Sequence, residues 1–161
     1  MTRVSWHSYF MKIARDASER ATCPRAQVGC VITRNRNILA TGYNGALPGH
    51  PHCIDVGVGC DMVEGHCIRT IHAERNAIAS AAKEGISVNG GTVYCTHKPC
   101  FECLKVLVAA GVKNIVYEQD YFNSPIPSHY LNRGDIYFKS LDEIDGVQHI
   151  GTVPSTEEKV Q

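Results

Sequence analysis

The sequence has no excess of charge of either sign, no long apolar run and no export signal. Sixteen Lys and Arg residues balance sixteen Asp and Glu residues, so the formal net charge at pH 7 is zero. This charge balance disfavours a protein that binds long nucleic acids. No run of 18 apolar residues is present, which excludes a membrane-spanning helix. The first ten residues have no apolar core followed by a cleavage site, so we expect a cytoplasmic protein.

Cysteine and histidine are the unusual part of the composition. The 161 residues include eight of each, while hydrophobic residues make up 43% and charged residues 20% of the chain. The profile is that of one globular domain, expected at 1–150 and followed by a polar tail at 151–161. Without an export signal we expect reduced thiols, so metal binding explains the cysteines better than disulfide bonds do.

The apolar periodicity predicts alternating strands and helices. A segment rich in Gly, His, Cys and Pro at 45–69 shows no periodicity, and we interpret it as an insertion that a function or a metal must order. The element order predicts an α/β domain of three layers, a sheet flanked by helices. The expected helices are 6–20, 70–85 capped by Thr70, 99–110 opened by Pro99, and 128–132; the expected strands are 28–33, 38–43, 92–96, 114–117 and 135–138.

Two short motifs carry the chemistry, His72-Ala73-Glu74 and Pro99-Cys100-Phe101-Glu102-Cys103. On a helix, Cys100 and Cys103 share a face and are able to bind one metal. One His and two Cys leave a fourth tetrahedral position for water, as in catalytic zinc sites, and a nearby Glu is suited to moving protons. A lone Cys-x-x-Cys is as often structural as functional, and a lone His-x-Glu means little. Their combination favours a catalytic centre.

The two motifs together resemble the signature of zinc-dependent nucleobase deaminases. The chain is similar to the cytidine deaminase superfamily, and within it to the deoxycytidylate deaminases of bacteria and phages. If a phage encodes it, the resemblance implies the host cytoplasm as its location. The resemblance extends over residues 5–140 and implies a five-stranded mixed sheet between helices. Cys30 departs from the family pattern, in which a small Ala is usual, and we expect it to be packed in the core. The similar segments are Val28-Gly29, Gly42-Tyr43-Asn44-Gly45, 49–52, and the run from Gly65 to Glu74 with its continuation to Ile78.

The resemblance implies a role for individual residues. His72, Cys100 and Cys103 would bind the catalytic zinc, and Glu74 would shuttle protons. A zinc-activated water would then convert dCMP to dUMP and ammonia, supplying dUMP for dTMP synthesis. Asn44 matches an asparagine that binds the sugar, although Tyr-Asn-Gly is also ordinary turn chemistry. For the 5′-phosphate we expect Arg25 and Tyr121, each of which has a solvated surface role as its alternative.

The same resemblance implies regulation and assembly. It implies activation by dCTP and inhibition by dTTP, with Mg²⁺ accompanying the triphosphate, at a site between the subunits of a hexamer. The candidate effector residues are Tyr43, Gly45 and Lys83. Lys83 is equally explained as a solvated lysine at the end of a helix.

Counting cysteines predicts a second, structural zinc. Cys30 and Cys95 alternate with apolar neighbours in expected strands and are assigned to the core. The insertion has too few large apolar residues to fold by burial, and a closed Cys₄ or Cys₃His site would order it. Incidental thiols in a flexible loop are the alternative. The expected ligands are Cys23, Cys53, Cys60 and either Cys67 or His66.

Two other functions compete with this interpretation. One is a different deaminase of the same fold, acting on cytidine or deoxycytidine, guanine or tRNA adenosine. The other is a non-catalytic zinc module that binds a partner, but such sites are closed by four protein ligands, whereas the trio here leaves one position vacant.

Overall fold

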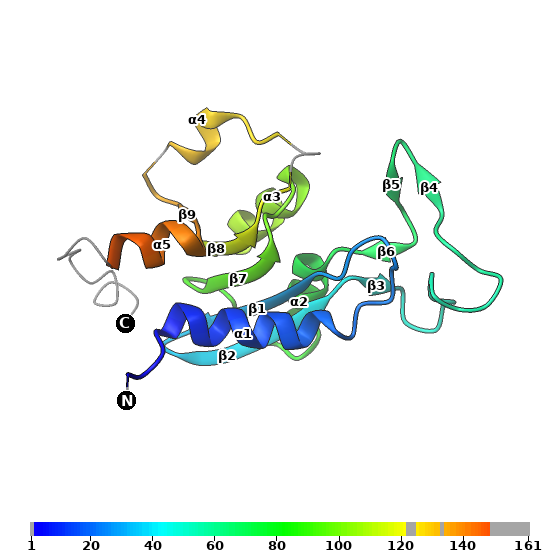
Figure 1. Cartoon of the computed structure of the whole chain (residues 1–161), viewed down its shortest axis with the longest axis horizontal. Coiled ribbons are helices and arrows are strands. Elements are labelled where there is room, and N and C mark those ends of the chain that lie inside the picture. The colour runs from blue at the N-terminus through cyan, green and yellow to red at the C-terminus, as the bar shows by residue number, and fades with distance from the viewer. Residues whose placement is uncertain (1, 122–124, 133, 149–161) are drawn as a thin grey trace.

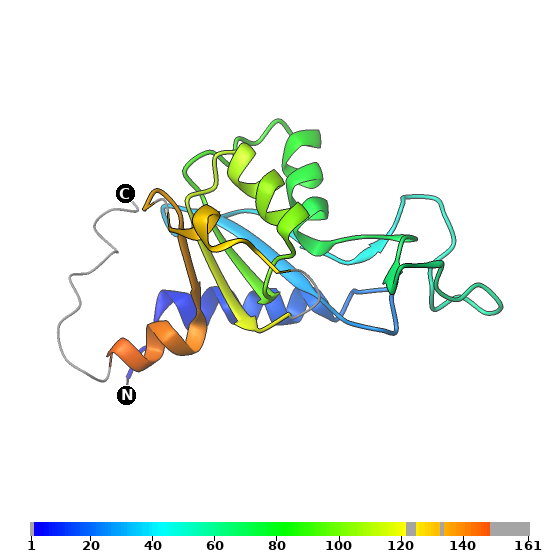
Figure 2. The same ribbon diagram turned by 90° about the horizontal axis from the view of Figure 1, so that it is seen from above.

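The computed structural model describes residues 2–121, 125–132 and 134–148. The expected tail at 151–161, and residues 149–150 of the expected domain, lie outside this range. A central sheet separates two helical layers, with α1 (Trp6–Ser18) and α5 (Leu141–Gln148) on one face and α2 (Ala73–Lys83) and α3 (Phe101–Ala109) on the other (Figures 1 and 2). The predicted three-layer α/β architecture is therefore confirmed. Within the described ranges, no helix is both long and apolar enough to cross a membrane.

The sheet has five strands in the order β2-β1-β7-β8-β9. β1 runs antiparallel to both β2 and β7, whereas β7, β8 and β9 are parallel, so the sheet is mixed, as predicted. The three parallel strands bring their carboxyl ends to one edge, the usual place for a site in an α/β domain. The strand bounds are β1 Gly29–Arg34, β2 Asn37–Tyr43, β7 Thr92–His97, β8 Asn114–Gln119 and β9 Tyr137–Ser140.

Alternate residues of the central strands build a core on each face of the sheet. Val31 belongs to the cluster under α1, and Cys30 and Ile32 belong to the cluster under α2 and α3. Cys30 lies directly opposite Cys95 across the β1–β7 pair, and both are fully buried. The expectation that these two cysteines are core residues is confirmed.

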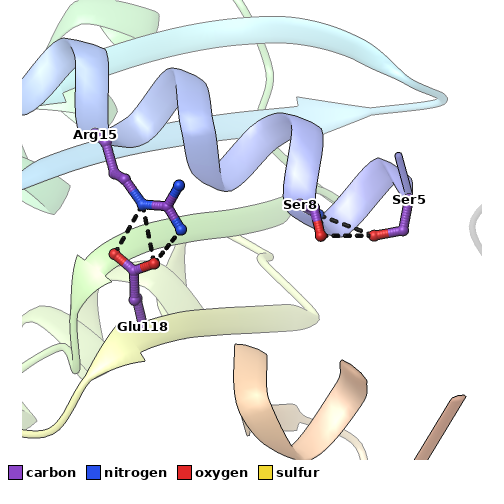
Figure 3. A network of polar contacts seen from close by, with 4 residues as sticks. All are labelled: Ser5, Ser8, Arg15 and Glu118. Carbon is purple, nitrogen blue, oxygen red and sulfur yellow. Dashed lines mark hydrogen bonds and ion pairs between the residues drawn. The ribbon is translucent and has the colours of Figure 1, made fainter. Parts of the chain in front are cut away.

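An ion pair ties α1 to the far end of β8. The Nε of Arg15 donates to both carboxylate oxygens of Glu118, at 2.9 and 3.0 Å, and the Nη2 of Arg15 adds a further contact (Figure 3). At the start of α1, the side chain of Ser5 caps the helix by accepting from the Ser8 N–H at 3.0 Å. The Arg15–Glu118 pair thus holds the end of α1 beside the edge of the sheet where the candidate site lies, and the Ser5 cap stabilises the start of the helix.

The predicted start of the second helix is wrong by two residues. Thr70 and Ile71 form the short strand β6, which pairs with β3 (Gly45–Ala46), and the N-cap of α2 is His72. The chain is therefore extended up to the first motif residue, because pairing with β3 holds it so. Similarly, α3 begins at Phe101 with Cys100 as its cap, two residues after Pro99.

Two other elements were not expected from the periodicity. The insertion carries a small hairpin, β4 (Met62–Val63) with β5 (His66–Cys67), so it is not without structure. Helix α5 follows β9 and starts with a reciprocal capping box: the Ser140 N–H donates to Glu143, and the Glu143 N–H donates to the Ser140 hydroxyl. The Ser-x-x-Glu pattern is a signal that sequence reasoning missed. The short helix α4 (Ser128–Leu131) agrees with the prediction.

Candidate active site and a second cysteine cluster

Three ligand-type side chains converge where α2 and α3 begin. His72 is the N-cap of α2, Cys100 is the N-cap of α3, and Cys103 lies in the first turn of α3. The Nδ1 atom of His72 lies 3.4 Å from the Sγ of Cys103 and 3.6 Å from the Sγ of Cys100. Both caps have extended backbone, which lets their side chains project past the helix ends. One imidazole and two thiols fit a tetrahedral metal that keeps one position open.

The protonation chemistry of this trio suits zinc. Hydrogen bonding with Cys103, together with that from His72, lowers the pKa of Cys100 to about 3. The hydrogen bond to Cys100 in turn raises the pKa of His72, and the hydrogen bond to Cys100 together with burial raises the pKa of Cys103, so these two groups would release protons on binding a metal. A sulfur that is a thiolate at neutral pH needs no proton removed before it binds a metal. The residues present therefore fit a zinc ion.

Glu74 lies in the first turn of α2, two residues after His72, and only 4% of its surface is exposed. Burial raises the pKa of its carboxyl group above the usual range. A carboxyl group tuned in this way is suited to accepting and returning a proton near neutral pH.

A cavity of about 290 Å³ opens over His72, Cys100 and Glu74, and Cys103 is buried beneath it. This volume lies at the low end of the range for small-molecule sites, roughly 300–1,000 Å³. It reaches from the insertion to the carboxyl ends of β7 and β8. The lining residues are Cys23, Arg25, Ala26, Val28, Asn44, His66, Cys67, Thr70, His72, Ala73, Glu74, His97, Lys98, Cys100 and Tyr121.

Asn44, the candidate sugar-binding residue, lines this cavity and is 7% exposed. Its Oδ1 accepts from the Val28 N–H at 2.8 Å, and its Nδ2 donates to the Ala26 carbonyl at 2.8 Å. The amide therefore clamps the segment before β1, a structural role that neither alternative of the sequence analysis included. These two bonds also orient the second N–H and the second lone pair of the amide.

The two candidate phosphate-binding residues, Arg25 and Tyr121, also line the cavity. Arg25 reaches the insertion, where its Nη1 donates to the Gly65 carbonyl at 2.8 Å. The structure thus brings all the catalytic and substrate-binding candidates together at one cavity, from segments that are far apart in the sequence.

His97 and Lys98 line the same cavity and were missed by sequence reasoning. Burial lowers the pKa of His97, and its Nδ1 lies 3.1 Å from the hydroxyl of Thr96. Lys98 forms an ion pair with Asp120 at 3.2 Å. The available signal was their place directly before Pro99-Cys100, at the end of a strand that leads into the metal-binding motif.

Four further cysteines form a second cluster, which we call the insertion cluster: Cys23, Cys53, Cys60 and Cys67. All four sulfurs lie within 4.8 Å of one another, with 3.7 Å between those of Cys23 and Cys60 and 3.6 Å between those of Cys53 and Cys67. The imidazole of His66 is not in the cluster and faces the cavity instead. Of the two alternatives, the structure therefore places Cys67 in the cluster.

The thiols of the insertion cluster differ in how readily they ionise, since burial raises the pKa of Cys53 to about 12 and also raises the pKa of Cys60. All eight cysteines are free thiols. Burial alone would raise the pKa of Cys67, but backbone N–H groups of Arg69 and Thr70 and neighbouring thiols lower it to about 7. Two cluster members, Cys23 and Cys67, also form part of the cavity wall, so any ion there would stiffen the candidate active site.

The three effector candidates do not form one cluster within the chain. The Tyr43 carbonyl accepts from the side chain of Asn76 at 2.7 Å, beside the first turns of α2, and Gly45 pairs with Ile71. Lys83 is exposed at the opposite end of α2, about two helical turns from Asn76.

Comparisons with known proteins agree with this geometry. Residues 4–119 match the family model of the cytidine and deoxycytidylate deaminase zinc-binding region. ComE operon protein 2 of Bacillus subtilis is 39% identical over 142 residues, covering 88% of this chain and 74% of that protein. Deoxycytidylate deaminase of Saccharomyces cerevisiae is 38% identical over 125 residues, which are 75% of this chain but only 40% of the yeast enzyme.

A solved structure extends the likeness to the fold. The dCMP deaminase of cyanophage S-TIM5, crystallised with dCMP and dUMP, superposes with a TM-score of 0.73 at 29% identity. The match covers 88% of this chain and all of the cyanophage chain.

Proposed function

Because the chain belongs to the cytidine and deoxycytidylate deaminase family, we propose that it hydrolyses dCMP to dUMP and ammonia. The observation that carries this proposal is the convergence of His72, Cys100 and Cys103 beside the buried carboxyl group of Glu74. The cyanophage relative, whose structure was solved with dCMP and dUMP, supports the choice of substrate.

His72, Cys100 and Cys103 would hold the zinc ion of the active site. Bound there, zinc lowers the pKa of a coordinated water toward neutrality and polarises it for attack on the base. Glu74 accepts the proton that the attacking water gives up and delivers it to N3 of the cytosine ring. It then takes the proton of the hydroxyl now on C4 and passes it to the exocyclic amino group, so that the C4–N bond breaks, the C4 carbonyl forms and ammonia leaves. The raised pKa of Glu74 suits both transfers.

The remaining cavity residues would bind the nucleotide. Asn44, oriented by its two backbone hydrogen bonds, has a donor and an acceptor left for the sugar hydroxyl. Arg25, Lys98 and Tyr121 supply cations and a hydroxyl for the 5′-phosphate. Such charge-assisted bonds favour a nucleotide over a nucleoside.

We infer that the insertion cluster holds a second, structural zinc. The four converging sulfurs support it, because a set of four protein ligands is typical of closed structural sites. Reduced thiols in both clusters are also consistent with the expected cytoplasmic location.

We further infer control by dCTP as activator and dTTP as inhibitor, with Mg²⁺ bound to the triphosphate, in a homohexamer. The hydrogen bond from Asn76 to the Tyr43 carbonyl supports a coupling between the effector candidates Tyr43 and Gly45 and helix α2, which carries Glu74. Lys83 lies far from Tyr43 and Gly45 within one chain. This separation supports an effector site to which two neighbouring subunits contribute.

Ammonia release from dCMP, deoxycytidine, cytidine and a tRNA anticodon arm would test the proposed substrate. We expect dCMP to be deaminated with a kcat/KM at least about tenfold above that of deoxycytidine, since the phosphate contacts are charge-assisted. Equal rates for nucleotide and nucleoside, or deamination of the tRNA arm, would assign the active site to the competing deaminase activities.

A further inference from the structure

A second cavity lies on the α1 face of the sheet, at the opposite end of the parallel strands from the active site. Its base is a row of four side chains that pair directly across neighbouring strands, Thr33 with Thr92, Thr92 with Asn114, and Asn114 with Tyr137. Three of these are the first residues of β7, β8 and β9. The active-site cavity, in contrast, contains His97 at the last position of β7. The two cavities share no lining residue.

The walls of this cavity are aromatic. Trp6 and Phe10 come from α1, Tyr94 from β7 and Tyr137 from β9. Phe10 stacks on Trp6 with ring centroids 5.5 Å apart and contacts Tyr94 at 5.3 Å. Rings from three elements therefore surround a space in which a further planar ring finds offset and edge contacts.

The base of the cavity is polar, and its two threonines are buried whereas Asn114 is half-buried. Thr33 is 3% and Thr92 is 4% exposed, and the two threonines and Asn114 form a hydrogen-bonded row. Asn114 Nδ2 donates to the Thr92 hydroxyl at 3.3 Å. In the described part of the chain, the Oδ1 of Asn114 accepts no hydrogen bond. A convergent acceptor beneath apolar walls is the usual design of a site that orients a small ring.

A cationic side chain, Arg36, lies at the mouth of this cavity. The guanidinium of Arg36 lies 5.2 Å from the Trp6 ring centroid, and Arg36 has no carboxylate partner among the residues described. Its φ is +64°, in the second position of a tight turn where glycine is favoured. This conformation disfavours a residue with a side chain, so the cation is placed over the cavity in spite of a local cost.

From these features we propose that this cavity, the α1-face cavity, binds a small aromatic anion. The ligand class is one planar six-membered ring that carries a carboxylate directly, as in benzoate, or a phosphate through a sugar, as in a pyrimidine nucleotide. The ring enters between Trp6 and Tyr137, and the anionic group stays at the mouth with Arg36. The enclosed space is about 70 Å³, about half of the roughly 150 Å³ that holds benzene in an engineered cavity. The space is therefore too small to enclose a whole ring, so one edge of the ring would lie between Trp6 and Tyr137 while the remainder stays at the mouth. A fused double ring would leave still more of its surface outside.

The chain has one tryptophan, and it lines this cavity, so its fluorescence reports occupancy directly. The full chain would be titrated with benzoate, dUMP, dAMP and inorganic phosphate. The variant Arg36→Gln removes the cation at an exposed turn, and Lys12→Gln, an exposed position on α1 outside the cavity, is the matched control. Phosphate alone tests for simple anion binding, and dAMP tests the size limit.

We expect benzoate or dUMP to change the Trp6 emission saturably. Arg36→Gln should weaken that binding about tenfold, and Lys12→Gln should leave it unchanged, because one charge-assisted contact is lost only in the first variant. A response to benzoate assigns the site to free aromatic acids, and a response to dUMP alone assigns it to pyrimidine nucleotides. No saturable change up to about 10 mM, or a change that is equal in the wild type and Arg36→Gln, would overturn the proposal. An equal change in the wild type and Arg36→Gln would mean that dUMP acts on the Trp6 emission from the active site.

Discussion

Gly42 of β2 packs directly against the carbonyl oxygen of Ala73 in the first turn of α2. A Cβ atom built on Gly42 would lie 2.2 Å from that oxygen and 2.5 Å from the Ala77 nitrogen. The sheet backbone thus touches the helix backbone at the turn that carries Glu74. The position of Glu74, the proposed proton carrier, is therefore set by contact with β2 as well as by its place two residues after His72.

The first prediction concerns this contact. Gly42→Ala should push α2 away from β2, lower the free energy of unfolding by about 1–3 kcal/mol, and reduce kcat by displacing Glu74. Urea unfolding and steady-state kinetics would measure both effects. Thr41→Ala, at the exposed neighbouring position, is the control and should change neither. Wild-type stability and kcat for Gly42→Ala would show that α2 is free to shift.

The second prediction concerns Glu74. Glu74→Gln should keep the fold and the zinc content but lower kcat by roughly 10⁴-fold or more, the upper end for a general acid–base group, since one carboxylate serves several proton transfers. Zinc analysis and circular dichroism would establish that only the chemistry is lost. More than about a tenth of wild-type activity in this variant is incompatible with the proposed proton shuttle.

The third prediction is a metal count. Protein purified without chelator should contain about two zinc ions per chain, one for each cluster. Cys53→Ser and Cys67→Ser should each lower the ratio towards one and destabilise the insertion. His66→Ala and Cys30→Ala should both retain two ions, because neither side chain belongs to a cluster. A ratio of one in the wild-type protein, measured by elemental analysis, rules out the structural zinc.

The fourth prediction separates phosphate binding from base chemistry. Arg25→Gln should raise the KM for dCMP by about tenfold, the effect of one lost charge-assisted bond. The kcat/KM for deoxycytidine should stay the same, since the nucleoside has no phosphate. Arg20→Gln, an exposed position outside the cavity, is the matched control. A parallel loss with both substrates would mean that Arg25 acts only through its bond to the Gly65 carbonyl.

The fifth prediction concerns regulation. With Mg²⁺ present, dCTP should lower and dTTP should raise the dCMP concentration that gives half-maximal rate, because the two effectors would stabilise different states of one protein. Lys83→Gln should weaken both shifts if Lys83 pairs with an effector phosphate. Saturation curves that superimpose with and without each triphosphate would leave no role for an effector site.

Local features of the chain determined much of the site. The spacing of Cys100 and Cys103, the cap and a first-turn residue of α3, keeps both sulfurs close together at the start of that helix. The alternation of apolar residues likewise determined that Cys30 and Cys95 face the core. The Gly-Tyr-Asn-Gly motif identified Asn44 as a candidate site residue. It did not reveal the two hydrogen bonds that Asn44 forms with the backbone of Val28 and Ala26. Such features depend on neighbours within a few residues, so they are readable from sequence.

Only the tertiary structure decided what depends on distant segments. It placed Cys67 and not His66 beside Cys23, more than 40 residues away in the chain, because the β4–β5 hairpin turns the two adjacent side chains in different directions. It set His97 in the active-site cavity. It also assembled the α1-face cavity from the first residues of three strands and the start of α1. Strand order and helix docking bring such residues together through non-local packing, and no local pattern in the sequence records that packing.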